Sequence, residues 1–241
     1  MTVPYEISIV IPTFEEDAAL APLLKRIRNW PRKPREVIVV DGASRPETRA
    51  LCERQQALWL PSVHGRGVQL MKGAMHAKGT ALWFIRADSE PHPESLGAIA
   101  VAIDSGAVGG YFRFRFTGQR RWYKALLERA IGLRCRWGVP YGDQGIFATR
   151  EFFDVCGGFA PTPLFEEVPL VKALRRQGRF DALPIPIGVS ELRWERDGWW
   201  RRILGTRLLS MGYLLGVSPA RLARWAAVVN RTESGPADSA D

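Results

Sequence analysis

Short apolar runs alternate with segments of helical periodicity along the first hundred residues. The runs at 7–11, 36–40 and 81–85 each stop at a polar or turn-forming residue, as strands do. Between the first two, leucine and isoleucine at positions 20, 23, 24 and 27 recur at helical spacing, and another helix is expected after the turn at 64–67. This alternation predicts an α/β fold with a mostly parallel central sheet flanked by helices and with ligands at the carboxyl ends of the strands.

The second half combines a strictly alternating strand with amphipathic helices. Phenylalanine alternates with tyrosine and arginine over 111–116, which predicts a half-buried strand, and a basic amphipathic helix is expected over about 120–135. The later elements expected are a loop at 138–144, a short strand at 145–148, a helix at 167–177, a strand at 182–189, and amphipathic helices at 199–215 and 219–229. The polar tail, 232–241, is expected to be disordered.

Composition narrows the class of protein. The chain has 241 residues, of which 46% are hydrophobic, so it can bury a sizeable core. No apolar run approaches the roughly 18 residues of a spanning helix, and no signal-peptide pattern opens the sequence. The three cysteines match neither a zinc site nor a redox pair. We therefore expect a cytoplasmic location, either in solution or peripheral on the inner face of the cell membrane.

Lysine and arginine number 34 against 25 acidic residues, which gives a formal net charge of +9. This excess favours an anionic partner: nucleic acid, a nucleotide or an acidic lipid surface. Residues 113–136 hold eight basic side chains and one acid, and tryptophan accompanies arginine near the C-terminus, a composition that suits a membrane interface. Two alternatives stay open: a solvated basic surface over ordinary core, and helices that pack on each other or across a homodimer.

Acidic side chains follow the predicted strands. Asp41 comes directly after 36–40, where a carboxylate can accept hydrogen bonds from a base or ribose, although a turn aspartate would look the same. Asp88 follows 81–85 and is the best candidate for a Mg²⁺ ligand, because that ion is held by one or two carboxylates plus substrate phosphates; a helix cap is the alternative. Glu167 opens a predicted helix, where acids are also favoured for structural reasons.

Two weaker signals complete the candidate chemistry. Asp143 and Gln144 lie in a glycine-flanked loop that is too polar to be core, although a plain turn would look the same. Arg66 and Lys72 accompany two glycines in a pattern that is a weak indication of phosphate binding.

Taken together and in order, five segments carry a resemblance to a known family. They are IVIPTFEE at 9–16, EVIVVDGAS at 36–44, FIRADS at 84–89, GDQ at 142–144 and FEE at 165–167. With them the chain strongly resembles the family 2 glycosyltransferases of GT-A fold, from residue 7 to about residue 225. The segments GRGVQL at 65–70, RWERDG at 193–198 and LGVSPARLAR at 215–224 are similar to a bacterial subgroup, the rSAM/selenodomain-associated transferases 2.

The resemblance implies roles for individual residues. A nucleotide-sugar donor, with UDP as the expected nucleotide, would lie against Pro12, Thr13, Glu15, Glu16, Asp41, Arg66, Lys72 and Asp88. Asp88 would also hold Mg²⁺ or Mn²⁺ under the diphosphate, and Glu167 would be the general base that deprotonates the acceptor hydroxyl. Asp143, Gln144, Arg193 and Trp194 would lie on the acceptor side.

The same resemblance implies a single domain over 1–231. Its parts would be a nucleotide-binding half (1–110), an acceptor half (111–198) and amphipathic helices (199–231). The acceptor would be a saccharide or a lipid-linked molecule delivered from a membrane surface.

Three residues depart from the family's usual pattern. Arg86 stands where the family has an acid and the subgroup commonly has histidine, and its permanent charge would repel a metal or partly replace it. Glu15 replaces a common asparagine, which would alter nucleotide contacts, and Glu167 replaces the usual aspartate, which moves the carboxylate by about one methylene.

Three functions compete at this stage. The leading hypothesis is an inverting glycosyltransferase. A sugar-phosphate nucleotidyltransferase is the alternative enzyme, but it should carry a glycine-rich basic signature after the first strand, where this chain has the acidic segment 12–16. A non-catalytic protein that binds nucleic acid, nucleotide or membrane would explain the net charge, but not the acids at successive strand ends; we expect no nucleic-acid partner.

Overall fold

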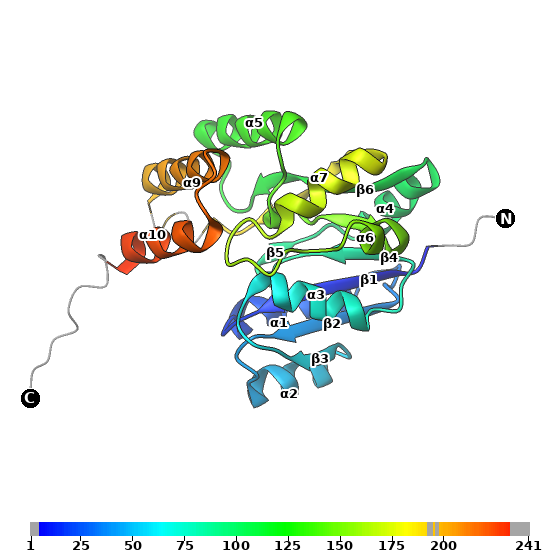
Figure 1. Ribbon diagram of the computed structural model, residues 1–241. Helices are drawn as coiled ribbons and strands as arrows, with labels where there is room; N and C mark the ends of the chain where they lie inside the picture. Colours follow the sequence, from blue (N-terminus) through cyan, green and yellow to red (C-terminus); the bar gives the residue numbers. More distant parts are fainter. Residues whose placement is uncertain (1–4, 192–194, 196–197, 232–241) are drawn as a thin grey trace, which may run out of the picture.

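A twisted sheet with helices on both faces forms the body of the protein in the computed structural model, which describes residues 5–191, 195 and 198–231 (Figure 1). The sheet has eight strands in the order β3-β2-β1-β4-β7-β6-β8-β5. They are β1 (Ile7–Thr13), β2 (Glu36–Asp41), β3 (Leu58–Pro61), β4 (Ala81–Phe84), β5 (Ser89–Glu90), β6 (Ala107–Phe116), β7 (Phe147–Thr149) and β8 (Arg179–Val189). Four pairings are parallel (β1–β2, β1–β4, β2–β3, β6–β8) and three antiparallel (β4–β7, β6–β7, β5–β8), so the predicted mostly parallel sheet is confirmed.

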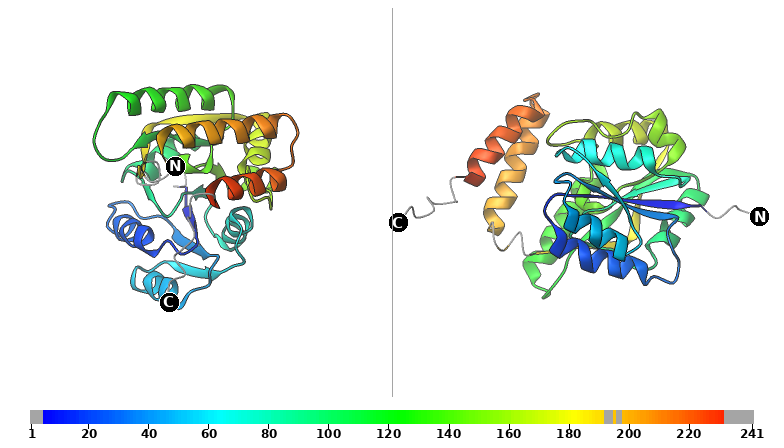
Figure 2. Two further views of the ribbon diagram at one scale, coloured as in Figure 1. Left: turned by 90° about the vertical axis from the view of Figure 1, so that its left-hand side faces the viewer. Right: turned by 90° about the horizontal axis from the view of Figure 1, so that it is seen from below.

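The helices cover the two faces of the sheet and one end of the molecule (Figures 1 and 2). They are α1 (Asp17–Arg28), α2 (Pro46–Arg54), α3 (Arg66–His76), α4 (Ser95–Asp104), α5 (Trp122–Trp137), α6 (Arg150–Val155), α7 (Glu167–Gln177), α9 (Trp199–Leu214) and α10 (Pro219–Arg231), with a short 3₁₀ helix, η1 (Gly142–Gln144). Core side chains of α1, α2 and α4 pack on one face, and those of α3, α6 and α7 on the other. In both views of Figure 2, α9 and α10 lie together, away from α1 and α2.

The central strand explains why the N-terminal apolar run shows no alternation. All seven residues of β1 are buried. Ile9 and Ile11 pack against the α1 side of the sheet, whereas Val10 packs against the α3 side. A strand that is buried on both faces reads as a continuous apolar run. The four periodic residues of α1 are each at most 2% exposed, so the predicted amphipathic helix is confirmed.

Helix α4 and the first half of strand β6 are among the features that were not expected from the sequence. Helix α4 buries six of its ten residues, so it has no polar face wide enough to give a helical period. Strand β6 begins at Ala107, four residues before the predicted start, because Gly109 and Gly110 conceal its first half. A Cβ atom on Gly110 would lie 2.3 Å from the carbonyl oxygen of Asp181 on β8, so this close pairing requires glycine.

The amphipathic helices predicted near the C-terminus are present as α9 and α10. None of the helices in the described part of the chain has the length and apolar content needed to span a bilayer. The tail at 232–241, predicted to be disordered, lies outside the described residues.

Candidate functional site

The carboxyl ends of three parallel strands form one edge of the sheet. Strand β1 lies between β2 and β4 and is parallel to both, so Thr13, Asp41 and the 86–88 segment come to the same edge. A hollow of about 280 Å³ opens there, which we name the strand-end cleft. It is lined by Pro12, Thr13, Phe14, Glu16, His64, Arg66, Gln69 and Arg86. The structure therefore brings together four of the predicted donor-binding residues and adds Arg86.

Asp41 is fully buried beside this cleft, and its carboxylate is engaged by its own loop. It accepts hydrogen bonds from the backbone N–H groups of Ala43 (2.9 Å) and Arg45 (2.7 Å) and from the indole of Trp59 (3.3 Å). Three donors fix the shape of the loop after β2. Asp41 is not among the lining residues of the cleft, so its role toward a nucleotide stays a prediction.

Arg86 and Asp88 form an ion pair directly after β4. The Arg86 Nε atom lies 2.9 Å from Asp88 Oδ1, and the two side chains are 24% and 10% exposed. Burial acts to lower the pKa of Arg86, but Asp88, together with the carboxylates of Asp143 and Glu166, holds that pKa above its ordinary value. A permanently charged guanidinium thus lines the cleft and already occupies part of the Asp88 carboxylate.

Arg66 joins the cleft to the acidic pair at the start of α7. Its Nε atom lies 3.2 Å from Glu166 Oε1, and the Glu166 side chain is only 4% exposed. The guanidinium lies so close to Gly142 that a Cβ there would come within 1.5 Å of Nη2. On the same helix, a Cβ on Gly67 would lie 2.1 Å from the carbonyl oxygen of Ala160. Both glycines therefore let α3, η1 and the loop before α7 approach one another.

Glu167 is buried at the first position of α7. Its Oε1 accepts a hydrogen bond of 3.3 Å from the backbone N–H of Gly142, and its Oε2 has no hydrogen-bond partner among the described atoms. Burial, together with the neighbouring carboxylates of Glu166 and Asp143, raises the pKa of this carboxyl to about 8, whereas Arg66 opposes the shift. A buried carboxyl with a pKa near neutrality and an unpartnered oxygen is suited to accept a proton.

Aromatic contacts tie the start of α7 to the C-terminal helices. Phe165, just before the acidic pair, has φ of 60°, a conformation that non-glycine residues rarely adopt. The centroid of its ring lies 4.7 Å from that of Tyr213 in α9 and 5.9 Å from that of Tyr141, the N-cap residue of η1. The Tyr141 hydroxyl also hydrogen-bonds to Ser210 of α9 (2.7 Å). Helix α9 therefore touches the loops that position Glu166 and Glu167.

The remaining predicted site residues lie in different places. Glu15 is exposed and has φ of 55°, and Lys72 donates from Nζ to the carbonyl oxygen of Pro61 (2.6 Å), outside the lining of the cleft. Asp143 lies in η1 near Glu167, while the buried Gln144 faces a second groove beneath α5. Arg193 and Trp194 lie outside the described residues.

Gln69 and the aromatic pair of Phe14 and His64 are features of the cleft that the sequence did not predict. Gln69 donates from Nε2 to the carbonyl oxygens of Thr13 and Val40, both at 2.8 Å, and so joins the ends of β1 and β2. The sequence places Gln69 on the buried stripe of α3, which could have indicated this role because a buried amide must find hydrogen-bond partners. Phe14 and His64 lie with ring centroids 4.2 Å apart in the lining of the cleft.

The side chains do not fit a divalent-metal site as they lie. Asp88, the predicted ligand, is paired with Arg86, and a guanidinium at 2.9 Å opposes a second cation at the same carboxylate. Within the described residues, no three histidine, cysteine or acidic side chains group closely enough to hold a metal.

Comparison with known sequences relates this chain to glycosyltransferases. The model of the family named Glycosyl transferase family 2 matches residues 8–163. An undecaprenyl-phosphate 4-deoxy-4-formamido-L-arabinose transferase of Pseudomonas fluorescens is 29% identical over 159 residues, which are 59% of this chain and 46% of that protein. The enzyme of the same name from Edwardsiella ictaluri is 29% identical over 138 residues, 52% of this chain and 42% of that one. The chain thus spans about half the length of the curated relatives it matches.

Solved structures confirm the fold. A mannosyltransferase from Pyrobaculum calidifontis, in complex with GDP-Man and Mn²⁺, superposes with a TM-score of 0.63 at 19% identity, over 86% of this chain and 63% of that one. Glucosyl-3-phosphoglycerate synthase from Mycobacterium tuberculosis, in complex with Mn²⁺, UDP and glucosyl-3-phosphoglycerate, gives 0.58 at 22% identity, over 86% and 79% of the two chains. The GT-A fold that the resemblance implied is thereby confirmed, whereas the narrower subgroup stays a prediction. Since the family model matches well over half of its residues, the chain belongs to glycosyl transferase family 2.

Proposed function

We propose that this protein is an inverting transferase that moves a sugar from a nucleoside-diphosphate donor to an acceptor hydroxyl. The observation that carries the proposal is the Glu167 carboxyl, buried, raised in pKa to about 8 and joined through Glu166 and Arg66 to the strand-end cleft. The strand-end cleft, with its arginines, suits an anionic leaving group, and the Glu167 carboxyl suits a proton transfer.

Glu167 and the cleft arginines account for every proton and charge that moves in this reaction. The acceptor oxygen attacks the anomeric carbon from the face opposite the diphosphate, and its proton passes to Glu167. The bond between the anomeric carbon and the diphosphate oxygen breaks with its electron pair, so the nucleoside diphosphate leaves and the configuration inverts. Arg66 and Arg86 are the two guanidiniums in the cleft lining, and they are placed to stabilise the charge on the departing diphosphate.

We assign this stabilisation to arginine rather than to Mg²⁺ or Mn²⁺. The support is the Arg86–Asp88 pair, because the carboxylate that would hold a metal already has a cationic partner. The two solved structures described above contain Mn²⁺ with their ligands, so this proposal sets the present chain apart from them.

The finer assignments rest on the relatives. UDP and GDP-Man occur in the similar structures, and a nucleotide-sugar donor fits the cleft's position at the strand ends. The curated relatives are named for an undecaprenyl-phosphate acceptor, which supports a lipid-linked acceptor here. We further propose that residues 1–110 bind the donor and 111–198 the acceptor. A nucleotidyltransferase is not favoured, because the segment after β1 remains the acidic one and the family is that of glycosyltransferases.

Substitution of the base tests the proposal. Glu167→Gln keeps the Oε1 atom that accepts from Gly142 but cannot take a proton. After a screen of nucleotide sugars has identified a donor, kcat should fall by roughly 10² to 10⁴, with donor affinity unchanged. Glu151→Gln, at an exposed glutamate of α6, is the matched control and should leave both values unchanged. An equal loss of donor affinity and kcat in Glu167→Gln would assign the residue to donor binding instead.

A further inference from the structure

A second and larger hollow lies beneath α5, apart from the strand-end cleft. It has a volume of about 920 Å³ and runs between α5 and the strands β6 and β8; we name it the α5 groove. Its lining residues are Tyr111, Arg113, Phe114, Arg115, Arg120, Ala125, Glu128, Arg129, Gly132, Leu133, Arg136, Gln144, Ala182, Pro184 and Pro186. None of them lines the strand-end cleft, so the groove is a separate feature.

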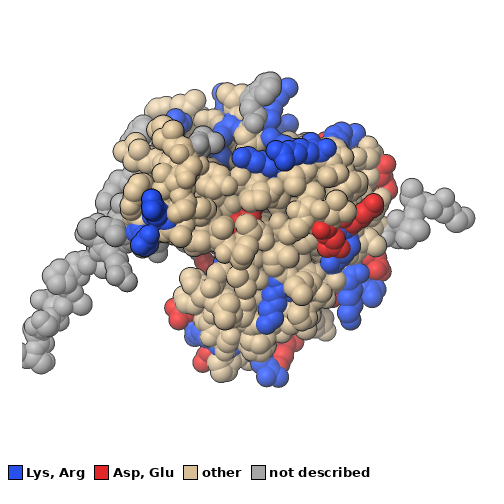
Figure 3. Space-filling view, in the orientation of Figure 1, with Lys and Arg blue, Asp and Glu red and all other residues tan. Residues whose placement is uncertain are grey.

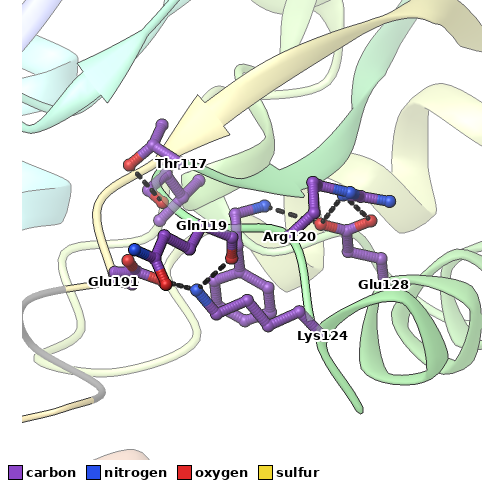
Figure 4. Close-up of polar contacts among 8 residues, drawn as sticks. Thr117, Gln119, Arg120, Lys124, Glu128 and Glu191 are labelled. Atoms are coloured by element: carbon purple, nitrogen blue, oxygen red, sulfur yellow. Dashed lines mark hydrogen bonds and ion pairs between the residues drawn. The ribbon is translucent and has the colours of Figure 1, made fainter. Parts of the chain in front are cut away.

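Contacts at the start of α5 hold this helix over the strands (Figure 4). Lys124 is 2% exposed and pairs with Glu191, just beyond β8, while it also donates to the carbonyl oxygen of Gln119. Glu128 accepts from the backbone N–H of Phe116 (2.9 Å) and pairs with Arg120 (3.0 Å). Lys124 therefore does not belong to an outward basic face, contrary to what the basic helix of the sequence suggested.

The groove carries an excess of positive charge. Five arginines line it against one acid, and that acid is already paired with Arg120. In the part of the chain that the structure describes, the other four have no acidic group within ion-pair distance: Arg113, Arg115, Arg129 and Arg136, all of them exposed. Figure 3 shows several basic side chains on the upper part of the molecule, where Figure 1 places α5. Such a surface attracts an anion.

A buried donor in the groove wall gives an independent indication of a ligand. Gln144 is 1% exposed, and its Oε1 accepts from the backbone N–H of Tyr141 (3.2 Å) and from the thiol of Cys135 (3.0 Å). The amide nitrogen at the other end, Nε2, has no partner among the described atoms. A buried N–H group without an acceptor destabilises the fold, and a phosphate oxygen in the groove would supply that acceptor.

Exposed apolar side chains flank the groove at helical spacing. Helix α5 exposes Trp122, Leu126 and Leu133 (80%, 59% and 64%). Helix α9 and its C-cap expose a stripe at i, i+4, i+7 and i+11, made of Leu204, Leu208, Met211 and Leu215 (60%, 56%, 54% and 79%). The two helices meet where the ring of Tyr123 packs on that of Trp199, with centroids 5.2 Å apart. Figure 2 shows them running side by side.

We propose that the α5 groove binds the phosphate headgroups of anionic membrane lipids, while the apolar stripes of α5 and α9 enter the bilayer interface. Charge complementarity selects this occupant. A second copy bound by the same face would bring arginine against arginine, and a nucleic acid would use the arginines but leave seven large apolar side chains in water. A lipid surface satisfies both kinds of group at once. This inference is independent of the chemistry proposed at Glu167.

Vesicle co-sedimentation tests the groove. The full chain should bind vesicles of phosphatidylcholine mixed with phosphatidylglycerol, should bind pure phosphatidylcholine far more weakly, and should be released by added salt. Arg113→Gln with Arg115→Gln removes two charges from the groove floor, outside the strand-end cleft. The vesicle affinity should fall roughly 25-fold, since each basic side chain near such a surface contributes about 1 kcal/mol, or roughly fivefold.

The matched control changes two basic residues elsewhere. Lys25→Gln with Arg32→Gln alters the same net charge at exposed positions on and just after α1, and it should leave vesicle binding nearly unchanged. If the two double variants lost vesicle affinity equally, net charge alone would explain the binding, and the α5 groove would not be the binding site. Binding to a short oligonucleotide with no binding to anionic vesicles would overturn the lipid assignment, and so would equal binding to the two kinds of vesicle. Nucleotide affinity and thermal stability, measured on each variant, should match those of the parent chain.

Discussion

At the strand-end cleft, Arg66 and Arg86 each lie against a carboxylate, and both pairs are largely shielded from water. In the α5 groove, Arg113 and Arg129 are exposed and no acidic side chain of the described residues pairs with them. Paired and shielded charges hold fixed positions and shift the pKa of neighbours, which suits chemistry on a bound substrate. Unpaired and exposed charges are available to a large anionic surface, but they do not position a reacting atom.

The same contrast extends to packing. Around the cleft, the tight contacts at Gly67 and Gly142 bring three elements together. On α5, a Cβ on Gly132 would have no neighbour within 4 Å. One region therefore has its geometry fixed by close packing, whereas the other leaves room for a ligand.

Removal of the Arg86 charge should give the largest loss. In Arg86→Gln the side chain can still donate to Asp88 but carries no charge toward a diphosphate. Affinity for UDP or GDP, measured by calorimetry, should fall by about 10- to 100-fold, or 1.5–3 kcal/mol, the range for hydrogen bonds to charged groups. Arg86→Lys should lose less, and Arg32→Gln, at an exposed arginine far from the cleft, should lose nothing.

The same calorimetric experiment separates arginine from metal. The parent chain should bind the nucleotide equally well in EDTA and in Mn²⁺. Binding that appears only with Mn²⁺ would show that a metal, and not the Arg86 guanidinium, neutralises the diphosphate.

A pair of glycine substitutions compares the packing of the two regions. Gly67→Ala places a methyl group 2.1 Å from a backbone carbonyl oxygen, which cannot turn away, so the free energy of unfolding should fall by roughly 1–3 kcal/mol. Gly132→Ala adds a methyl group in open space on a helix and should raise it by about 0.5–1 kcal/mol. Denaturant midpoints measure both. Similar values for the two variants would remove the distinction in packing.

Glu167→Gln should stabilise the fold near neutral pH, by a smaller amount. The pKa of Glu167 is raised from 4.5 to about 8 in the folded state, so the native protein holds a proton that the unfolded chain releases, and its stability falls as pH rises between these values. Glu167→Gln has no such proton to lose, so its free energy of unfolding does not fall in this pH range. Near neutral pH it should exceed that of the parent chain by roughly 1 kcal/mol, after the cost of a buried amide is subtracted, and this difference should vanish at acidic pH. A gain that is constant with pH, measured by thermal unfolding, would contradict a raised pKa.

Local patterns predicted much of the fold. The spacing of four apolar residues located α1, and the acid-opened apolar period at 167–177 gave the bounds of α7. The turn residues after three apolar runs located the strand ends, and with them the edge where the cleft lies. These features depend on neighbours in the chain, so one sequence is enough to find them.

The contacts that give the site its chemistry join distant segments. Arg66 reaches Glu166 across one hundred positions, and Lys124 reaches Glu191 across 67. No local pattern marks which of many basic residues will be paired, so the sequence did not distinguish the buried Lys124 from the exposed basic residues around it. Similarly, the link from Tyr141 to Ser210 depends on where α9 packs.

The pH dependence of sugar transfer shows whether Glu167 acts as the general base. With an identified donor at subsaturating concentration, kcat/KM reports the free enzyme, in which Glu167 must lose its proton before it can act as a base. The profile should rise with pH through an inflection near 8, where burial and the neighbouring carboxylates place the pKa of Glu167. The residual activity of Glu167→Gln should lack this inflection. A profile of the parent chain that is flat across this range, or an inflection that persists in Glu167→Gln, would contradict the account.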